Sequence, residues 1–204
     1  PFLHINDNDK NGFMSTVNGL DRTKGLDLIL HTPGGETAAT ESIIDYLKTM
    51  FSDIRVIVPQ LAMSGGTMIA CAAQKILMGK HSSLGPIDPQ LGGGLAAHAI
   101  LEEFKTAHEE IKQDQTKVFV WQPIIAKYNP TLIGECQKSI AWSEQIAKTC
   151  LKERMFAGEA DADTKIVTIM RELGDHATNL SHARHLSAVK CKEMGLKIEM
   201  LEEN

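Results

Sequence analysis

The chain has 204 residues, a length that suits one sizeable domain. Its formal net charge is −5 and its basic residues are scattered, which argues against nucleic acid as a partner. No apolar run reaches the ~18 residues that a membrane-spanning helix needs. The four cysteines show no metal-ligand spacing, so we expect no metal site and a reducing, cytoplasmic environment.

The first residues indicate a boundary and then a helix. The chain begins at Pro1 without a starting methionine or a signal peptide, so we interpret it as a fragment of a longer protein. Any membrane association is then expected only through segments absent from this sequence. The cluster from Asn6 to Asp9 predicts a capped helix that carries Phe13 and Val17. A calcium loop is the alternative, but its glycine and final glutamate are missing.

Apolar runs that alternate with helical patterns follow. We expect strands over 26–31, 54–58 and 75–78 and helices over 36–51 and 64–73. Continuous apolar runs are typical of parallel strands buried on both faces, and the alternation indicates βα units. Turns at the carboxyl ends of such strands are where α/β sheets bind ligands.

Two of these turns contain residues suited to acyl-transfer chemistry. Gly34 and Gly35 let a substrate approach the backbone and let N–H groups point at a developing oxyanion. Ser64 is expected at the first turn of a helix, where Gly65 and Gly66 leave its hydroxyl uncrowded. A serine that merely caps this helix is the alternative. The Gly-Gly turn upstream favours a nucleophile.

The second half of the chain is predicted to be mainly helical. The glycine run over 92–94 predicts a flexible segment beside the substrate groove, and helices are expected over about 97–111, 121–128, 131–156 and 161–173. The helix over 131–156 carries more apolar residues than packing on one sheet face requires.

Three motifs carry a resemblance to a known family. They are Thr32-Pro33-Gly34-Gly35, Ala62-Met63-Ser64-Gly65-Gly66-Thr67, and the run from Met78 to Gln90 that contains Ser83-Leu84-Gly85-Pro86-Ile87-Asp88-Pro89. From about Asn6 to Leu196 the chain resembles the serine dehydrogenase proteinase family of the ClpP/crotonase superfamily, which is related to signal peptide peptidase A. The resemblance implies an α/β, ClpP/crotonase-like fold of repeated βα units with C-terminal helices. It implies one domain over 1–204, with a core over about 1–93 and a helical remainder over about 97–204.

The resemblance also implies a serine peptidase without a cofactor. Ser64 would attack the peptide bond of a peptide or protein substrate, and the N–H groups of Gly34 or Gly35 and of Gly65 would form the oxyanion hole. Helices in the corresponding region join subunits in the superfamily. A homo-oligomer is therefore expected, with Trp142 either at a subunit contact or in ordinary core packing.

The general base is not settled by the resemblance, because the sequence departs from the ClpP pattern. Asp88 stands where ClpP has its catalytic histidine, and Ala183 stands at the acid position. We therefore expect His182, and next His185, to be the base, with Asp88 orienting it. Lys105 is the alternative, because signal peptide peptidase A types use a lysine at a comparable spacing.

Two other classes of function remain open. One is a crotonase-type acyl-CoA enzyme, which has a similar oxyanion hole but needs no nucleophile; binding of acyl-CoA would distinguish it. The other is a non-catalytic scaffold that keeps the fold. Failure of Ser64 to react with a fluorophosphonate would favour the scaffold.

Overall fold

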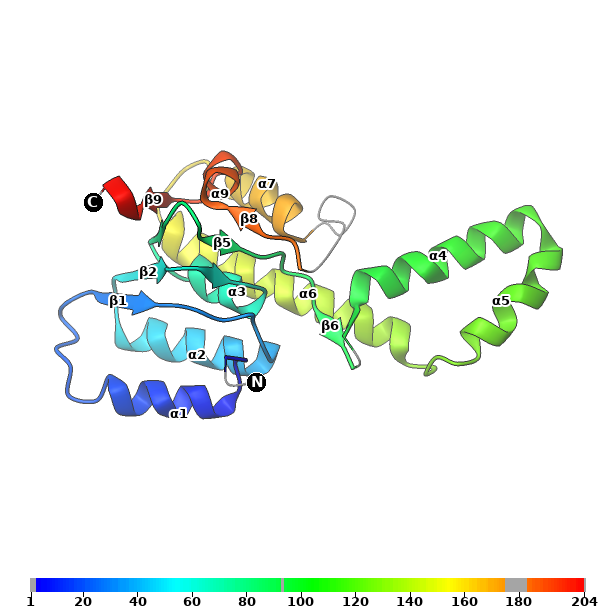
Figure 1. Cartoon of the computed structure of the whole chain (residues 1–204), viewed down its shortest axis with the longest axis horizontal. Helices are drawn as coiled ribbons and strands as arrows, with labels where there is room; N and C mark the ends of the chain where they lie inside the picture. Colours follow the sequence, from blue (N-terminus) through cyan, green and yellow to red (C-terminus); the bar gives the residue numbers. More distant parts are fainter. Residues whose placement is uncertain (1–2, 93, 175–182, 204) are drawn as a thin grey trace. The chain divides into compact units, whose positions relative to one another are not determined.

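The computed structural model describes residues 3–92, 94–174 and 183–203 (Figure 1). These residues form two compact units. One comprises residues 1–87 and 144–204, and the other comprises residues 88–143. Helix α6 (Leu132–Cys150) begins in the second unit and ends in the first.

The first unit is built on a parallel sheet. Its strands, in spatial order, are β1 (Leu26–Ile29), β2 (Ile54–Val58), β4 (Lys75–Met78) and β9 (Ile198–Met200). Leu28, Val56, Ile76 and Ile198 lie in register on one face of this sheet, and all of them are buried. The α/β fold with βα units is thereby confirmed.

The other face of the sheet is not buried, so the expectation that these strands are buried on both faces is wrong. Asp27 and Arg55 form a bidentate ion pair there, with both N–O distances 2.6 Å, and Lys75 pairs with Glu199 at 2.8 Å. Ile29 on the same face is 70% exposed. The charged residues inside the apolar runs mark this open face.

Helices cover the buried face of the sheet. They are α2 (Thr37–Met50), α3 (Gly65–Cys71), the end of α6 with its π-helical continuation η2 (Leu151–Met155), α7 (Ala162–Gly174) and α9 (Ala188–Glu193), whereas α1 (Asp7–Thr16) packs against α2. In Figure 1, α1 lies along α2, and the two helices are in contact. The expected helices of this unit are confirmed.

The acidic cluster before α1 is a helix cap. The side chain of Asn6 accepts the N–H of Asn8 at 2.9 Å, and the carboxylate of Asp9 accepts the N–H of Asn6 at 2.8 Å. This reciprocal capping box satisfies N–H groups at the helix start. It accounts for these side chains without calcium.

A second, smaller sheet in this unit was not predicted. It consists of β3 (Leu61–Ala62), β5 (Ser83–Leu84) and β8 (Leu186–Ser187), with β3 and β5 parallel and β8 antiparallel to β5. Strands of two residues are too short to produce a periodic sequence pattern. This sheet nevertheless positions the residues around Ser64.

The second unit is a hairpin and three helical segments. Strands β6 (Gln90–Leu91) and β7 (Leu95–Ala96) precede α4 (Ala97–Gln113), η1 (Gln115–Lys117), α5 (Val118–Ile125) and the start of α6. Ala97, Ile100 and Cys136 form its small buried core. Gly94, with φ of 77°, donates its N–H to Leu91 where the hairpin turns.

All four cysteines are free and buried. Burial raises the pKa of Cys150 to about 11 and that of Cys191 to about 12, and it raises the pKa of Cys71 as well. The short η3 segment (Leu201–Glu203) ends the described chain. Within the described ranges, every helix is too short or too polar to cross a bilayer.

Candidate active site

Ser64 lies in a strained turn between β3 and α3. Its φ is 51° and its ψ is −111°, and it is the one non-glycine residue with positive φ in the described part of the chain. Such a conformation costs about 1–3 kcal/mol and persists only where the surroundings impose it. Ser64 occupies the N-cap position of α3, but its side chain makes no capping hydrogen bond. The hydroxyl therefore does not serve the helix in the way an ordinary N-cap serine does.

The Gly34-Gly35 turn lies directly beside Ser64. The loop before it pairs with β3, because the N–H of Thr32 donates to Leu61 at 3.1 Å and its carbonyl accepts the N–H of Met63 at 3.0 Å. A Cβ added to Gly34 would lie 2.9 Å from the Cβ of Ser64, and Gly34 has φ of 105°. Only glycine fits this position without displacing the serine turn.

The N–H groups around Ser64 differ in what they bind. The N–H of Gly34 donates to the hydroxyl of Thr32 at 3.1 Å, and its carbonyl accepts the N–H of Ile5 at 2.9 Å. The N–H groups of Gly35 and Gly65 donate to no acceptor within residues 3–92, 94–174 and 183–203. Two backbone donors therefore remain available next to Ser64.

Two buried threonines fix these turns, and both went unnoticed in the sequence although they lie inside the quoted motifs. The hydroxyl of Thr32 donates to the carbonyl of Leu3 at 2.6 Å while it accepts the N–H of Gly34. The hydroxyl of Thr67 donates to the carbonyl of Ala62 at 2.8 Å and accepts the N–H of Gly85 at 3.1 Å. Each threonine thus joins a turn to a neighbouring strand or segment.

His185 lies next to the small sheet and is held by a serine. Its Nδ1 is 2.8 Å from the hydroxyl of Ser83. The histidine is exposed, whereas Ser83 is buried. If Nδ1 carries the ring proton, its N–H donates a hydrogen bond to the hydroxyl oxygen of Ser83, and Nε2 keeps its lone pair. Ser83 lies inside a quoted motif, but the sequence does not predict its contact with His185, because the two residues are 102 positions apart.

The segments that carry Ser64 and His185 leave the small sheet at the same end. Ala62 pairs with Leu84, and Leu84 pairs with Leu186. Because β8 is antiparallel, His185 extends beyond the same end of the sheet as Ser64. β3 and β8 are separated by two strand spacings, about 10 Å.

A model of the ClpP-like SDH-type serine proteinase family matches residues 1–200. The chain belongs to this family. Its parallel sheet and helices agree with a ClpP-like α/β fold.

The curated relatives of this ClpP-like family member are longer than the chain. The uncharacterized protein MJ0137 of Methanocaldococcus jannaschii is 32% identical over 198 residues, which cover 97% of this chain and 61% of the relative. The uncharacterized protein MJ1495 of the same organism is 34% identical over 173 residues, which cover 85% of this chain and 51% of the relative. The chain thus spans between half and two thirds of these proteins.

A shorter match reaches a protease subunit. The ATP-dependent Clp protease proteolytic subunit of Streptococcus thermophilus (strain ATCC BAA-491 / LMD-9) is 35% identical over 74 residues, covering 35% of this chain and 38% of the subunit. This partial similarity agrees with the chain's membership of a ClpP-like family.

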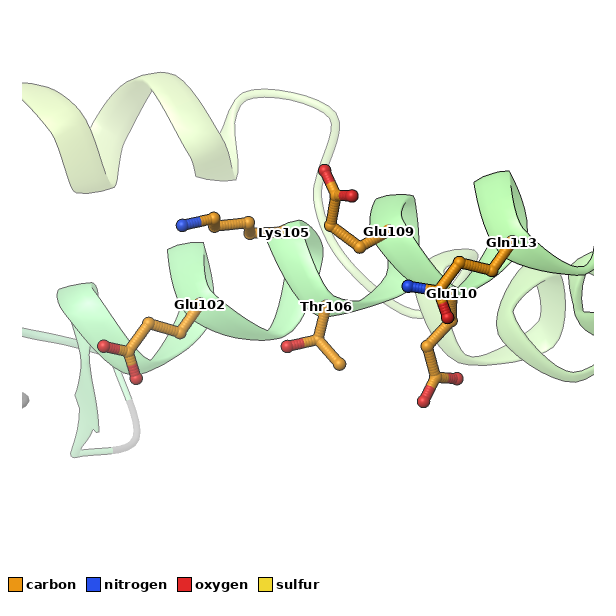
Figure 2. Close-up of a pocket in the computed structure, with 6 residues that line it drawn as sticks. All are labelled: Glu102, Lys105, Thr106, Glu109, Glu110 and Gln113. Carbon is orange, nitrogen blue, oxygen red and sulfur yellow. The ribbon is translucent and has the colours of Figure 1, made fainter.

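The remaining candidate residues fall in different places. His182 lies outside the described residues. Asp88 is buried, with 2% of its surface exposed, and it begins the second unit. Lys105 is exposed on α4 beside Glu102 and Glu109, at an open groove that Figure 2 shows.

Within the ranges that the structure describes, no three histidine, cysteine, aspartate or glutamate side chains are grouped to hold a metal ion.

Proposed function

We propose that this protein is a serine peptidase with Ser64 as its nucleophile. The observation that carries the proposal is the strained, positive-φ conformation of Ser64, whose hydroxyl does not cap α3. A conformation that costs free energy and serves no helix points to a functional constraint. The family match supports peptide bonds as the substrate class.

In the proposed oxyanion hole, Gly35 and Gly65 supply the donors and Gly34 shapes the turn. Their N–H groups are available next to Ser64, whereas the N–H of Gly34 is bound to Thr32. Two such donors stabilise the charge that develops on the carbonyl oxygen.

The proposed reaction proceeds through an acyl-enzyme. The hydroxyl oxygen of Ser64 attacks the peptide carbonyl as the general base takes its proton. The tetrahedral intermediate collapses, the base returns the proton to the leaving amine, and water then hydrolyses the ester. These steps need no cofactor.

Two arrangements can supply the base. In one, His182 takes the proton and Asp88 orients it. In the other, His185 takes the proton and Ser83 holds its Nδ1, an arrangement supported by their 2.8 Å contact. Asp88→Asn should impair only the first arrangement and Ser83→Ala only the second, so the pair of variants discriminates between them.

The proposal is tested by peptide hydrolysis. Ser64→Ala should abolish cleavage and leave the melting temperature nearly unchanged. Ser15→Ala is the matched control, because Ser15 is an exposed serine of α1. Both should be assayed in the 204-residue chain and in the full-length protein. Undiminished hydrolysis by Ser64→Ala would contradict the proposal.

A further inference from the structure

Residues 3–5 run along the Gly34-Gly35 turn. The N–H of Ile5 donates to the carbonyl of Gly34 at 2.9 Å, and the carbonyl of Ile5 accepts the N–H of Glu36 at 2.9 Å. Ile5 and Gly35 thereby form a parallel β-bridge. This segment, the N-terminal strap, is therefore paired with the turn through its backbone.

The hydrogen bond from Ile5 fixes the orientation of the peptide unit between Gly34 and Gly35. A trans peptide is planar, so the carbonyl of Gly34 and the N–H of Gly35 point in opposite directions. Because the carbonyl is directed at Ile5, the N–H of Gly35 is directed away from it, and no acceptor in the described part of the chain binds this N–H. The strap thereby determines where the proposed oxyanion donor points.

The fit of the strap explains why glycine occupies position 35. A Cβ added to Gly35 would overlap the carbonyl oxygen and the nitrogen of Ile5. Both atoms belong to the backbone, so a side chain at this position would displace the strap. Gly34 meets the serine turn just as closely, because a Cβ added there would lie 2.9 Å from the Cβ of Ser64. The glycine turn is thus in close contact with the strap and with the serine turn.

The side chain of Ile5 reaches the second proposed donor. Ile5 is 6% exposed and belongs to the main hydrophobic core. Its Cδ1 lies 3.4 Å from the position that a Cβ on Gly65 would occupy. One residue outside the quoted motifs therefore lies against Gly35 and Gly65, the two glycines whose N–H groups are available.

We propose that Ile5 is a positioning residue of the oxyanion hole and acts through its backbone N–H on the peptide unit of Gly34 and Gly35. The inference rests on the proposed peptidase function, because Ile5 acts through a donor rather than on the substrate. Ile5 holds the N–H of Gly35 in its direction before the substrate binds, so the donor needs no reorientation as charge develops on the carbonyl oxygen. Loosening the strap should lower the rate of the chemical step more than it weakens substrate binding.

Ile5→Pro tests the inference in the full-length protein, because proline has no N–H to donate to Gly34. Steady-state peptide hydrolysis should show a kcat lowered by roughly tenfold or more with little change in KM. Ile5→Val keeps the N–H and should retain most of the activity. Arg22→Pro is the matched control and should behave as the unsubstituted protein. Arg22 is exposed at the second position of the turn from Asp21 to Lys24, where proline is favoured.

Gly35→Ala breaks the same contact from the other side. It keeps the N–H of residue 35, but its Cβ displaces the strap, so kcat should fall here as well. Because both substitutions remove one interaction, the double variant Ile5→Pro/Gly35→Ala should lose no more activity than the weaker of the two single variants. Urea denaturation shows that each variant is folded under the conditions of the assay.

Hydrolysis by the unsubstituted protein separates a failure of this inference from a failure of the proposed function. A protein that cleaves no peptide would contradict the peptidase function and the role of Ile5 with it. An active protein whose kcat is unchanged in Ile5→Pro would overturn only the role of Ile5. Additive losses in the double variant, or a raised KM at constant kcat, would overturn it too. If Ile5→Pro does not fold, an unchanged kcat in folded Gly35→Ala overturns it instead.

Discussion

The backbone of Ser64 allows the proposed strain to be measured. At φ of 51° a glycine is unstrained, whereas any residue with a Cβ is not. Ser64→Gly should therefore be more stable than Ser64→Ala by about 1 kcal/mol or more, and both variants should lack peptidase activity. Urea denaturation measures the two free energies of unfolding.

The comparison of glycine with alanine removes the effect of losing the hydroxyl. A Ser64→Gly variant that is less stable than Ser64→Ala would show that the turn is not strained.

Thr32 should position the oxyanion turn through its hydroxyl. Thr32→Val keeps the side-chain volume but removes the acceptor for the N–H of Gly34, so the turn can shift and kcat should fall by roughly tenfold with little change in KM. Thr32→Ser keeps the hydroxyl and should retain most of the activity. Steady-state hydrolysis of a peptide substrate gives both constants.

Equal activity in Thr32→Val and the unsubstituted protein would exclude this role. Equal loss in Thr32→Val and Thr32→Ser would instead indicate that only the packing of the methyl group matters.

At the scale of residues, the sequence was informative where a motif is local. Ser64 and the glycine turn were singled out from their neighbours in the chain, and the structure places them side by side. The hydrogen bond from the N–H of Gly34 to the hydroxyl of Thr32 depends on the fold of the turn. The contact between Ser83 and His185 joins residues 102 positions apart, which no local pattern encodes.

At the scale of elements, the buried thiols make the free energy of unfolding depend on pH. The folded pKa values of Cys150 and Cys191 lie at about 11 and 12, above the ~8.5 expected in the unfolded chain. Between about pH 8.5 and the folded pKa values, the unfolded state binds fewer protons than the folded state. The contribution of the two thiols to stability is therefore fully present below about pH 8.5 and is lost as the pH rises toward the folded pKa values. The free energy of unfolding should fall above about pH 8.5, by up to ~1.4 kcal/mol per pH unit for each thiol.

Urea denaturation under reducing conditions at a series of pH values measures this slope. Cys150→Ala should make the slope shallower, even though the variant is less stable overall. A free energy of unfolding that is constant between about pH 8 and pH 10 would contradict the assignment.

The regular elements were predictable, and the short ones were not. Strands over 54–58 and 75–78 and the long helices were expected close to their observed bounds, because each carries several residues of one period. The open face of the sheet is not evident from the sequence, because Asp27 and Arg55 lie inside otherwise apolar runs. The sheet of β3, β5 and β8 depends on pairing between distant segments.

For the whole molecule, we propose a homo-oligomer. Ile29, on the open sheet face of the first unit, and Trp142 of α6 are exposed apolar side chains that a partner subunit could cover. Light scattering of the full-length protein should give a multiple of its subunit mass at micromolar concentration. Ile29→Lys should lower that mass, and Val167→Lys, at a similarly exposed site on α7, should not.

A monomeric mass for the full-length protein would contradict the oligomer. An unchanged mass in Ile29→Lys would exclude only the sheet face as the contact.

Reaction with a fluorophosphonate tests the central claim most directly, because only an activated serine attacks the reagent. The unsubstituted chain, Ser64→Ala and Ser15→Ala should be treated in parallel, and the labelled peptide should be located by mass spectrometry. We predict that the label is attached to Ser64, that Ser15→Ala reacts normally and that Ser64→Ala does not react. Absence of labelling in the full-length protein, or a label on another serine that persists in Ser64→Ala, would contradict the assignment of Ser64 as the nucleophile.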